Sequence, residues 1–267
     1  MTIKRIILIV LLLILMLIYN YIQISKFYTN NVKLSSNKLS KSLKITQISD
    51  FHSNGYINLN ELFKKIGEFE PDLIVITGDL IDKNTEDLGL AIEVLEESKK
   101  ISTNVYFVSG NHEASNSLSY ELYNVLRELD IKHMDFKVKK LTINGNNINI
   151  FGVPFYVYED DFDLLYNKIS ERDYNLLLSH SPNKPINYIN ENIDLILSGH
   201  THGGQVRLPI IGGILSPGQG LLPKYDKGLY KIGNTTLYID SGLGNSVLPI
   251  RMFNRVQISN IEVLPEK

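Results

Sequence analysis

The chain has 267 residues, of which 43% are hydrophobic and 21% are charged, and it contains no cysteine. This length and hydrophobicity predict one large folded domain or two small ones, and they argue against a disordered chain. Without cysteine, the chain cannot contain a disulfide, a thiolate zinc site or a cysteine nucleophile. Residues 1–28 carry three basic residues and no acidic one, so the rest of the chain has a net charge of −5. Such an acidic body argues against nucleic acid as its main partner.

The amino-terminal segment has the pattern of a membrane helix. Residues 6–18 are apolar throughout, and Lys4 and Arg5 precede them. No small-x-small cleavage site follows, so we expect residues 1–25 to be an uncleaved, single-pass signal anchor in the cell membrane, with a removed signal peptide as the alternative. Lys4 and Arg5 favour an internal amino terminus and an extracytoplasmic domain, although the lysines at 38, 41 and 44 oppose this orientation.

Residues 26–42 are rich in Ser, Asn and Lys and show no apolar periodicity. This composition predicts a polar tether between the membrane helix and a folded domain that covers residues 43–267.

From residue 43 onward, one pattern occurs five times. A short apolar run with strand-like composition ends in a small polar residue or glycine, and side chains able to bind metal follow it. The five runs are residues 45–49, 73–77, 105–109, 176–179 and 195–198. Helical periodicity separates several of them, and Asn58 with Glu61 resembles a capping box. Alternating strands and helices predict parallel βαβ units.

Two later segments, residues 136–153 and 229–263, show hairpin patterns instead. Asn144-Gly145 and Gly233-Asn234 are tight-turn signals between alternating stretches. We therefore expect an α/β fold with two mixed β-sheets packed together and helices outside.

The carboxyl ends of the five apolar runs carry a recurrent set of polar side chains. Neighbouring strands lie about 4.8 Å apart, so side chains at these ends converge on a small volume. Asp, Asn and Gly also form ordinary turns, but that role does not explain why five of the six histidines occupy these positions. We expect a structural role for the sixth, His133. The candidate metal ligands are Asp50, His52, Asp79, Asn111, His180, His200 and His202.

Oxygen and imidazole ligands without thiolate suit two divalent ions, with Mn²⁺ expected and Zn²⁺ or Fe as alternatives. Seven ligands are too many for one tetrahedral site but suit two ions. One carboxylate is expected to bridge the ions, because two cations at close spacing need an anion between them. Two ions about 3.5–4 Å apart form a clamp for in-line displacement at phosphorus.

These motifs in this order resemble the calcineurin-like metallophosphoesterases. The resemblance runs from about residue 43 to the carboxyl terminus and rests on Asp50-x-His52, Gly78-Asp79, residues 110–113 (G-N-H-E), His180 and residues 199–202 (G-H-T-H). It implies a sandwich of two mixed sheets flanked by helices. It also implies a dimetal hydrolase of phosphoester or pyrophosphate bonds, in which a metal-bridging hydroxide attacks phosphorus.

The resemblance also implies individual roles. Asp50, His52, Asp79 and His202 would hold one ion. Asp79 would bridge to a second ion held by Asn111, His180 and His200. His112 would be the catalytic residue near the leaving-group oxygen rather than a ligand. Glu113 would orient His112, with a solvent-facing side chain as the alternative.

Residues 199–205 (G-H-T-H-G-G-Q), 223–225 and 228–230 resemble a bacterial membrane-associated branch of this family, described as similar to UDP-2,3-diacylglucosamine pyrophosphatase. Val256 follows Arg255 where that branch commonly has proline, so the terminal match is weaker. The resemblance and the anchor imply a phosphorylated small-molecule, lipid-linked or envelope substrate. The apolar, glycine-rich residues 208–222 are expected either to form a rim beside the site or to pack as a core hairpin. Arg207 and Arg251 are candidate phosphate contacts.

A different class of function is a non-catalytic, metal-stabilised binding module that keeps the fold. Lost ligands would mark such a module, and here the whole set and His112 are present. Dinucleotide-binding and P-loop enzymes are excluded, because their glycine-rich fingerprints are absent from the sequence. The sequence gives no signal for the oligomeric state.

Overall fold

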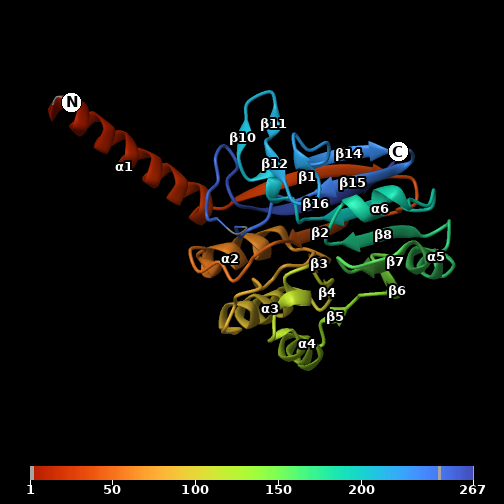
Figure 1. Ribbon diagram of the computed structural model, residues 1–267. Coiled ribbons are helices and arrows are strands. Elements are labelled where there is room, and N and C mark those ends of the chain that lie inside the picture. Colours follow the sequence, from red (N-terminus) through yellow and green to blue (C-terminus); the bar gives the residue numbers. More distant parts are fainter. Residues whose placement is uncertain (1–2, 246–247, 267) are drawn as a thin grey trace.

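Two six-stranded β-sheets pack face to face in the computed structural model, which describes residues 3–245 and 248–266 (Figure 1). The first sheet has the order β1-β16-β2-β3-β4-β5 and the second the order β14-β15-β9-β8-β7-β6. The strands of the first sheet are β1 (Tyr28–Ser36), β16 (Gln257–Pro265), β2 (Leu43–Ile48), β3 (Leu73–Ile76), β4 (Val105–Phe107) and β5 (Lys132–His133). Those of the second are β14 (Gly228–Ile232), β15 (Thr235–Ile239), β9 (Leu195–Ser198), β8 (Tyr174–Ser179), β7 (Asn146–Val153) and β6 (Lys137–Ile143).

Helices and short hairpins surround the two sheets. The helices are α1 (Ile3–Ser25), α2 (Leu59–Phe69), α3 (Gly89–Ile101), α4 (Ser119–Glu128), α5 (Glu159–Tyr166) and α6 (Asn183–Asn187). The short hairpins pair β10 (Arg207–Leu208) with β11 (Gly212–Gly213) and β12 (Leu215–Ser216) with β13 (Gly220–Leu221). The expected mixed-sheet sandwich with outer helices is therefore confirmed.

Side-chain alternation along each strand builds the layers. In β3, Leu73 and Val75 pack into the core between the sheets, whereas Ile74 and Ile76 pack against the helices α2, α3 and α4. A third cluster packs the outer face of the second sheet against α5. Successive strand side chains point to opposite faces, so strands buried on both faces read as continuous apolar runs. This is why the five runs stand out in the sequence.

The expected crossovers and turns are present. Strands β2, β3 and β4 pair in parallel, and α2 and α3 connect them. The side chain of Asn58 caps α2 by accepting a hydrogen bond from the Glu61 backbone N–H. Asn144 and Gly145 join β6 to β7, and Gly233 and Asn234 join β14 to β15. The chain after β15 does not form another hairpin, because β16 crosses to the first sheet and pairs with β1 and β2.

The polar tether expected over residues 26–42 is wrong for much of its length. Residues 28–36 form β1, which pairs in parallel with β16 along its whole length. The polar side chains of Asn31 and Lys33 lie on the exposed face of β1, so they do not prevent the strand from forming. Val32 is buried against the inter-sheet core. The folded domain therefore starts before residue 43.

The amino-terminal α1 is a 23-residue apolar helix that projects away from the sandwich (Figure 1). By length and composition it can span a bilayer, and only Ile24 and Ser25 at its end are buried. The predicted anchor and domain also include residues 1–2, 246–247 and 267, which lie outside the described residues.

Candidate metal centre

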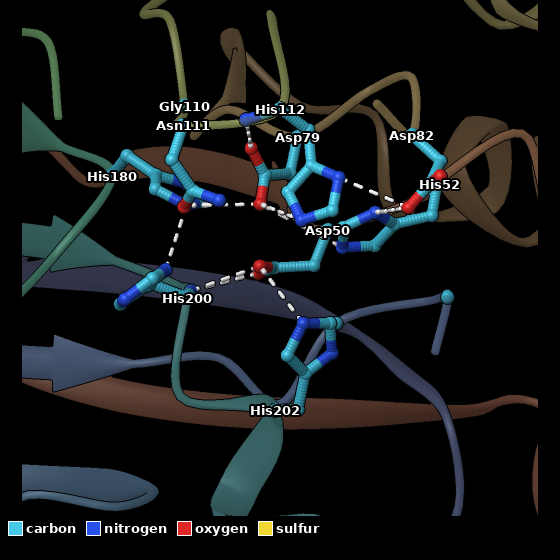
Figure 2. Close-up of polar contacts among 12 residues, drawn as sticks. Asp50, His52, Asp79, Asp82, Gly110, Asn111, His112, His180, His200 and His202 are labelled. Carbon is cyan, nitrogen blue, oxygen red and sulfur yellow. Dashed lines mark hydrogen bonds and ion pairs between the residues drawn. The ribbon is translucent and has the colours of Figure 1, made fainter. Parts of the chain in front are cut away.

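Loops from both sheets bring the predicted ligands together at the carboxyl ends of the strands. The loop after β2 supplies Asp50 and His52, the loop after β3 supplies Asp79, and the loop after β4 supplies Asn111. The loops after β8 and β9 in the second sheet supply His180, His200 and His202 (Figure 2). The site therefore spans the seam between the sheets, so it can form only when the sandwich is assembled.

Donor atoms in this site form adjoining groups. Asp50, His52 and His202 offer ligand atoms that all lie within 4.8 Å of one another. Asp79, His180 and His200 form a second such group. Asn111 joins the second group, because its Oδ1 lies 3.2 Å from His180 Nε2.

The carboxylate of Asp79 lies between the two groups. Its Oδ2 is 3.1 Å from His180 Nε2 in the second group and 3.7 Å from His52 Nε2 in the first. Its Oδ1 accepts a hydrogen bond of 2.9 Å from the His112 backbone N–H. The bridging role of Asp79 stays a prediction, and its carboxylate faces both groups.

The backbone that presents these side chains is unusual. Five of the seven candidate ligands, namely Asp50, His52, Asp79, His200 and His202, have φ between 47° and 67°. Residues other than glycine rarely adopt this left-handed conformation, and it persists where the surrounding structure enforces it, often at functional sites. Glycines permit the close approach of the loops. A Cβ on Gly110 would overlap Asp79 Oδ1, and one on Gly199 would overlap Asp50 Oδ2.

Hydrogen bonds fix the orientation of the ligands. The Nδ1 of His180 lies 2.8 Å from the Thr77 carbonyl oxygen, which places a proton on Nδ1 and directs Nε2 toward Asp79. The His200 backbone N–H donates to both carboxylate oxygens of Asp50, at 2.9 and 3.0 Å. Two strand-end loops from different sheets therefore hold each other in place.

Burial and mutual proximity perturb the pKa values in this cluster. Burial opposes protonation of His180, but Asp79 outweighs it and raises the pKa of His180 to about 10. His180 in turn lowers the pKa of Asp79 despite burial. Burial and His180 together lower the pKa of His200 to about 3, and burial lowers the pKa of His202. Perturbations of both signs within one cleft are typical of functional sites.

The donor set fits divalent cations. Both ring nitrogens of His52 are buried and have no hydrogen-bond partner among the residues that the structure describes. Nε2 lies 3.7 Å from the Asp79 carboxylate and Nδ1 lies 3.6 Å from the Asp82 carboxylate. Buried polar atoms are almost always satisfied, so nitrogens that face carboxylates without a hydrogen bond indicate a place for a cation. Imidazole nitrogens with carboxylate and amide oxygens suit Mn²⁺, Zn²⁺ or Fe.

The predicted catalytic His112 lies at the edge of the cluster, where its Nε2 is 3.9 Å from Asp79 Oδ2. Its Nδ1 accepts a hydrogen bond of 2.9 Å from the Lys83 backbone N–H and also lies 2.9 Å from the Asp82 carboxylate. The side chain is partly exposed. The sequence reasoning missed Asp82. The sequence feature that could have identified Asp82 is its position three residues after Asp79, in the same strand-end loop. A carboxylate at that position can reach His112.

The predicted role of Glu113 in orienting His112 is wrong. Its buried carboxylate instead accepts hydrogen bonds from four backbone N–H groups, those of Asp79, Leu80, Ile81 and Gly110. Glu113 thus ties together the two loops that carry Asp79 and Asn111. Burial and the neighbouring Asp79 raise the pKa of Glu113 to about 7. The solvent-facing alternative is also wrong, because the side chain is fully buried.

The two candidate phosphate contacts bind protein groups. Arg251 is 1% exposed, and its guanidinium donates to the carbonyl oxygens of Ser241, Gly244 and Asn254. It anchors the loop after β15, and its Nη2 also lies 3.5 Å from Nδ1 of the candidate ligand His202. The guanidinium of Arg207 donates to the Asp226 carboxylate at 2.8 Å. Both arginines therefore bind protein groups.

A cavity of ≈ 290 Å³ adjoins the cluster. His52 and Asp82 form its inner wall, and residues 53–56, Lys83, Asn84 and Asn245 form the rest.

Comparison with known proteins agrees with this geometry. The family model described as calcineurin-like phosphoesterase matches residues 43–204. An uncharacterized metallophosphoesterase of Bacillus subtilis, YkuE, is 30% identical over 223 residues, which cover 81% of this chain and 77% of that protein. An uncharacterized metallophosphoesterase of Helicobacter pylori is 31% identical and covers 86% of this chain. A Bos taurus transmembrane protein with metallophosphoesterase domain is 27% identical and covers 82%. This chain spans 62% and 52% of those two proteins, respectively.

Solved structures show the same fold. The NAD nucleotidase of Haemophilus influenzae superposes with a TM-score of 0.52 at 18% identity, over 76% of this chain and 46% of that one. A 5′-nucleotidase precursor from Thermus thermophilus gives 0.50 at 14% identity, over 84% of this chain and 54% of that one. The resemblance to UDP-2,3-diacylglucosamine pyrophosphatase stays a prediction. With the family model and the Bacillus relative covering its strand-end motifs, this chain belongs to the calcineurin-like phosphoesterase family and is a metallophosphoesterase.

Proposed function

We propose that this chain hydrolyses phosphoester or pyrophosphate bonds with two divalent metal ions, and that Mn²⁺ is the preferred metal. The observation that carries the proposal is the Asp79 carboxylate between two groups of buried donors, one in each direction. Asp50, His52 and His202 would hold one ion with Asp79, and Asn111, His180 and His200 would hold the other. When bound, the two ions supply a hydroxide nucleophile at neutral pH and neutralise charge on the phosphoryl oxygens.

The chain's own residues supply the rest of the chemistry. His112 faces the cluster through Nε2, and its Nδ1 accepts a hydrogen bond of 2.9 Å from the Lys83 backbone N–H, beside the Asp82 carboxylate. This arrangement orients the imidazole so that Nε2 delivers a proton to the leaving-group oxygen or stabilises its charge. Glu113 keeps the loops of Asp79 and Asn111 at a fixed separation through its four backbone hydrogen bonds.

We further propose that α1 anchors the chain in the membrane and that the catalytic domain is extracytoplasmic. Lys4 and Arg5 support an amino terminus on the cytoplasmic side. A lipid-linked or envelope phosphoester is the proposed substrate. The cavity supports this class, because Lys83 and Asn84 offer polar contacts for a headgroup next to His52 and Asp82.

The test is metal-dependent cleavage of a chromogenic phosphodiester by the full chain. We expect turnover with Mn²⁺ that chelation abolishes, and we expect Asp79→Asn and His112→Ala to lose it. His133→Gln is the matched control, because His133 lies outside the cluster and contacts Asp135 and Ser109. Unchanged turnover in both site variants would contradict the assignment. Metal binding without turnover of any diester or pyrophosphate would favour a non-catalytic binding module.

The substrate class needs a second assay in the same detergent. The full chain should turn over lipid-linked pyrophosphates faster than soluble diesters of equal leaving-group pKa. Equal rates for both would contradict a lipid preference.

A further inference from the structure

The carboxyl-terminal turns of α1 are fixed to the domain rather than loosely attached. Asn20 exchanges two hydrogen bonds with the loop that follows residue 248, donating to the Pro249 carbonyl oxygen at 2.8 Å and accepting from the Arg251 N–H at 2.9 Å. The hydroxyl of Tyr19 accepts from the Phe253 N–H at 2.9 Å. Such a connection transmits the orientation of the helix to the domain.

Two more contacts extend this connection toward the metal centre. Gln23 accepts hydrogen bonds from the backbone N–H groups of Asn254 and Val256. Asn54, in the loop that carries His52, donates to the Ile24 carbonyl oxygen at 3.1 Å. The end of α1 is therefore joined to one wall of the cavity beside the cluster.

Exposed apolar side chains gather next to this connection. Among the described residues outside α1, more than half of the exposed large hydrophobic side chains lie between residues 208 and 253. Most of them lie in the hairpins β10–β11 and β12–β13, directly beside these hairpins, or in the loop 248–253. We call six of them the apolar face: Ile210, Ile211, Leu221, Leu222, Ile250 and Phe253.

Backbone hydrogen bonds join the hairpins to each other and to the loop. The Leu222 N–H donates to the Ile214 carbonyl oxygen, and the Ile214 N–H donates to that of Val206, both at 2.9 Å. The Arg207 N–H donates to the Met252 carbonyl oxygen at 2.9 Å, and the Met252 N–H donates to that of Gln205 at 3.3 Å. Figure 1 shows the β10–β11 hairpin rising from the sandwich on the side from which α1 projects. The loop bearing Phe253 thus joins the apolar face directly to α1.

The chemistry of this surface matches the boundary of a bilayer. Tyr19 packs edge-on against Phe253, and Tyr21 packs edge-on against Tyr56, so aromatic rings surround the helix at its exit from the apolar segment. Aromatic side chains of this kind concentrate at the headgroup level. The sequence has no acidic residue in 199–225 or in 241–261, so no carboxylate of these segments opposes contact with anionic lipid.

We propose that the apolar face is a second membrane contact, which lies in the headgroup layer beside α1. The inference rests on the proposed anchoring by α1. The bilayer is the occupant because the hydrogen bonds to Tyr19, Asn20 and Gln23 place the loop 248–254 where a spanning α1 leaves the hydrocarbon. With two contacts, the domain cannot tilt freely on the membrane, and the cavity wall at residues 53–56 is held near the lipid surface.

The absence of tryptophan from the sequence makes the test direct. Single tryptophans are introduced into the full chain at Ile210, Phe253, Leu15 and Tyr120, and each variant is reconstituted into phosphatidylcholine–phosphatidylglycerol vesicles. Leu15 reports the middle of α1, and Tyr120 is the matched exposed control on α4. The readouts are the emission maximum and quenching by brominated phosphatidylcholine, measured without metal so that catalysis plays no part.

We expect Ile210→Trp and Phe253→Trp to be blue-shifted relative to Tyr120→Trp and quenched at least half as strongly as Leu15→Trp. Solvent-like emission without quenching at both positions, beside normal quenching at Leu15, would overturn the second contact alone. A blue shift without quenching would show that a second copy of the chain covers the face, and it would also overturn the proposal. Absence of quenching in Leu15→Trp would contradict the anchoring by α1 and, with it, the second contact.

Discussion

The metal centre and the apolar face both depend on glycine and left-handed backbone, yet they differ in what surrounds those residues. In the metal centre, Gly110 and Gly199 are in tight contact with side chains of the opposite loop, and the polar groups are buried. In the apolar face, a Cβ on Gly220 would meet no atom within 4 Å, and the apolar side chains are exposed. Similar backbone conformations therefore serve a rigid polar site in one place and an open apolar surface in the other.

This difference predicts how each region responds to substitution. In the metal centre, small changes displace ligands because the surrounding atoms cannot move away. On the apolar face, substitutions leave the fold intact and change only what binds there. The expected effects therefore decrease from the buried polar centre to the exposed surface.

The largest effect is expected from Gly110→Ala. The new Cβ would overlap Asp79 Oδ1 and displace the proposed bridging carboxylate. Outer-shell substitutions cost about 10–100-fold in metal affinity or activity, so a displaced ligand should cost more than about 100-fold in kcat/KM. Gly67→Ala in α2 is the control, because its Cβ meets only Ile101 Cδ1 at 4.0 Å. Retained activity in Gly110→Ala would contradict the bridging role of Asp79.

Arg251→Met should lower stability rather than weaken substrate binding. The substitution leaves the carbonyl oxygens of Ser241, Gly244 and Asn254 without their buried donor, at a cost of about 2–4 kcal/mol in the free energy of unfolding. Urea unfolding measures this loss, and exposed Arg127→Met is the control. A raised KM with unchanged stability would instead restore Arg251 as a phosphate contact.

Asp82→Asn should reduce kcat by about 10–100-fold while metal content stays unchanged. The asparagine keeps the shape of the side chain but removes the carboxylate charge that lies 2.9 Å from His112 Nδ1 and stabilises the protonated imidazole. Steady-state kinetics with a chromogenic diester and metal analysis of the same sample separate the two effects. Exposed Asp160→Asn serves as the control, and a kcat equal to that of the wild type would show that His112 does not depend on this carboxylate.

The smallest effect on stability is expected from Ile211→Ser on the apolar face. In detergent, the free energy of unfolding should stay within about 0.5 kcal/mol of the wild-type value. The matched change Ile150→Ser in the inter-sheet core should cost more than about 2 kcal/mol, because Ile150 is fully buried. Equal losses in the two variants would mean that the apolar face is packed rather than free.

Much of the fold and the candidate ligand set follows from the sequence for physical reasons. Strands buried on both faces appear in the sequence as continuous apolar runs, which can be identified without knowing the neighbouring strands. The carboxyl ends of parallel strands lie at the same edge of a sheet, where ligand sites form. Histidine is rare enough in this chain that five in equivalent positions are informative. The left-handed backbone at Asp50, Asp79 and His200 was not predicted, because the tertiary contacts impose it.

The errors share one cause, which is contact between distant segments. The strand β1 has polar side chains and is defined by its pairing with β16, more than 200 residues away. Glu113 contacts the Asp79 loop rather than its sequence neighbour His112, and Arg251 is buried by carbonyl groups of the loop after β15. Side-chain type and spacing predict which residues can bind a metal, but they do not predict which buried charge will stabilise a loop.

The central claim is that two metal ions lie on either side of Asp79. It is tested most directly by a crystal structure of the Mn²⁺-loaded chain, with anomalous diffraction measured at the manganese edge. We predict two anomalous peaks about 3.5–4 Å apart. One peak should adjoin Asp50, His52 and His202, the other Asn111, His180 and His200, and both should contact Asp79. A single peak, or two peaks that do not share Asp79, would contradict the account.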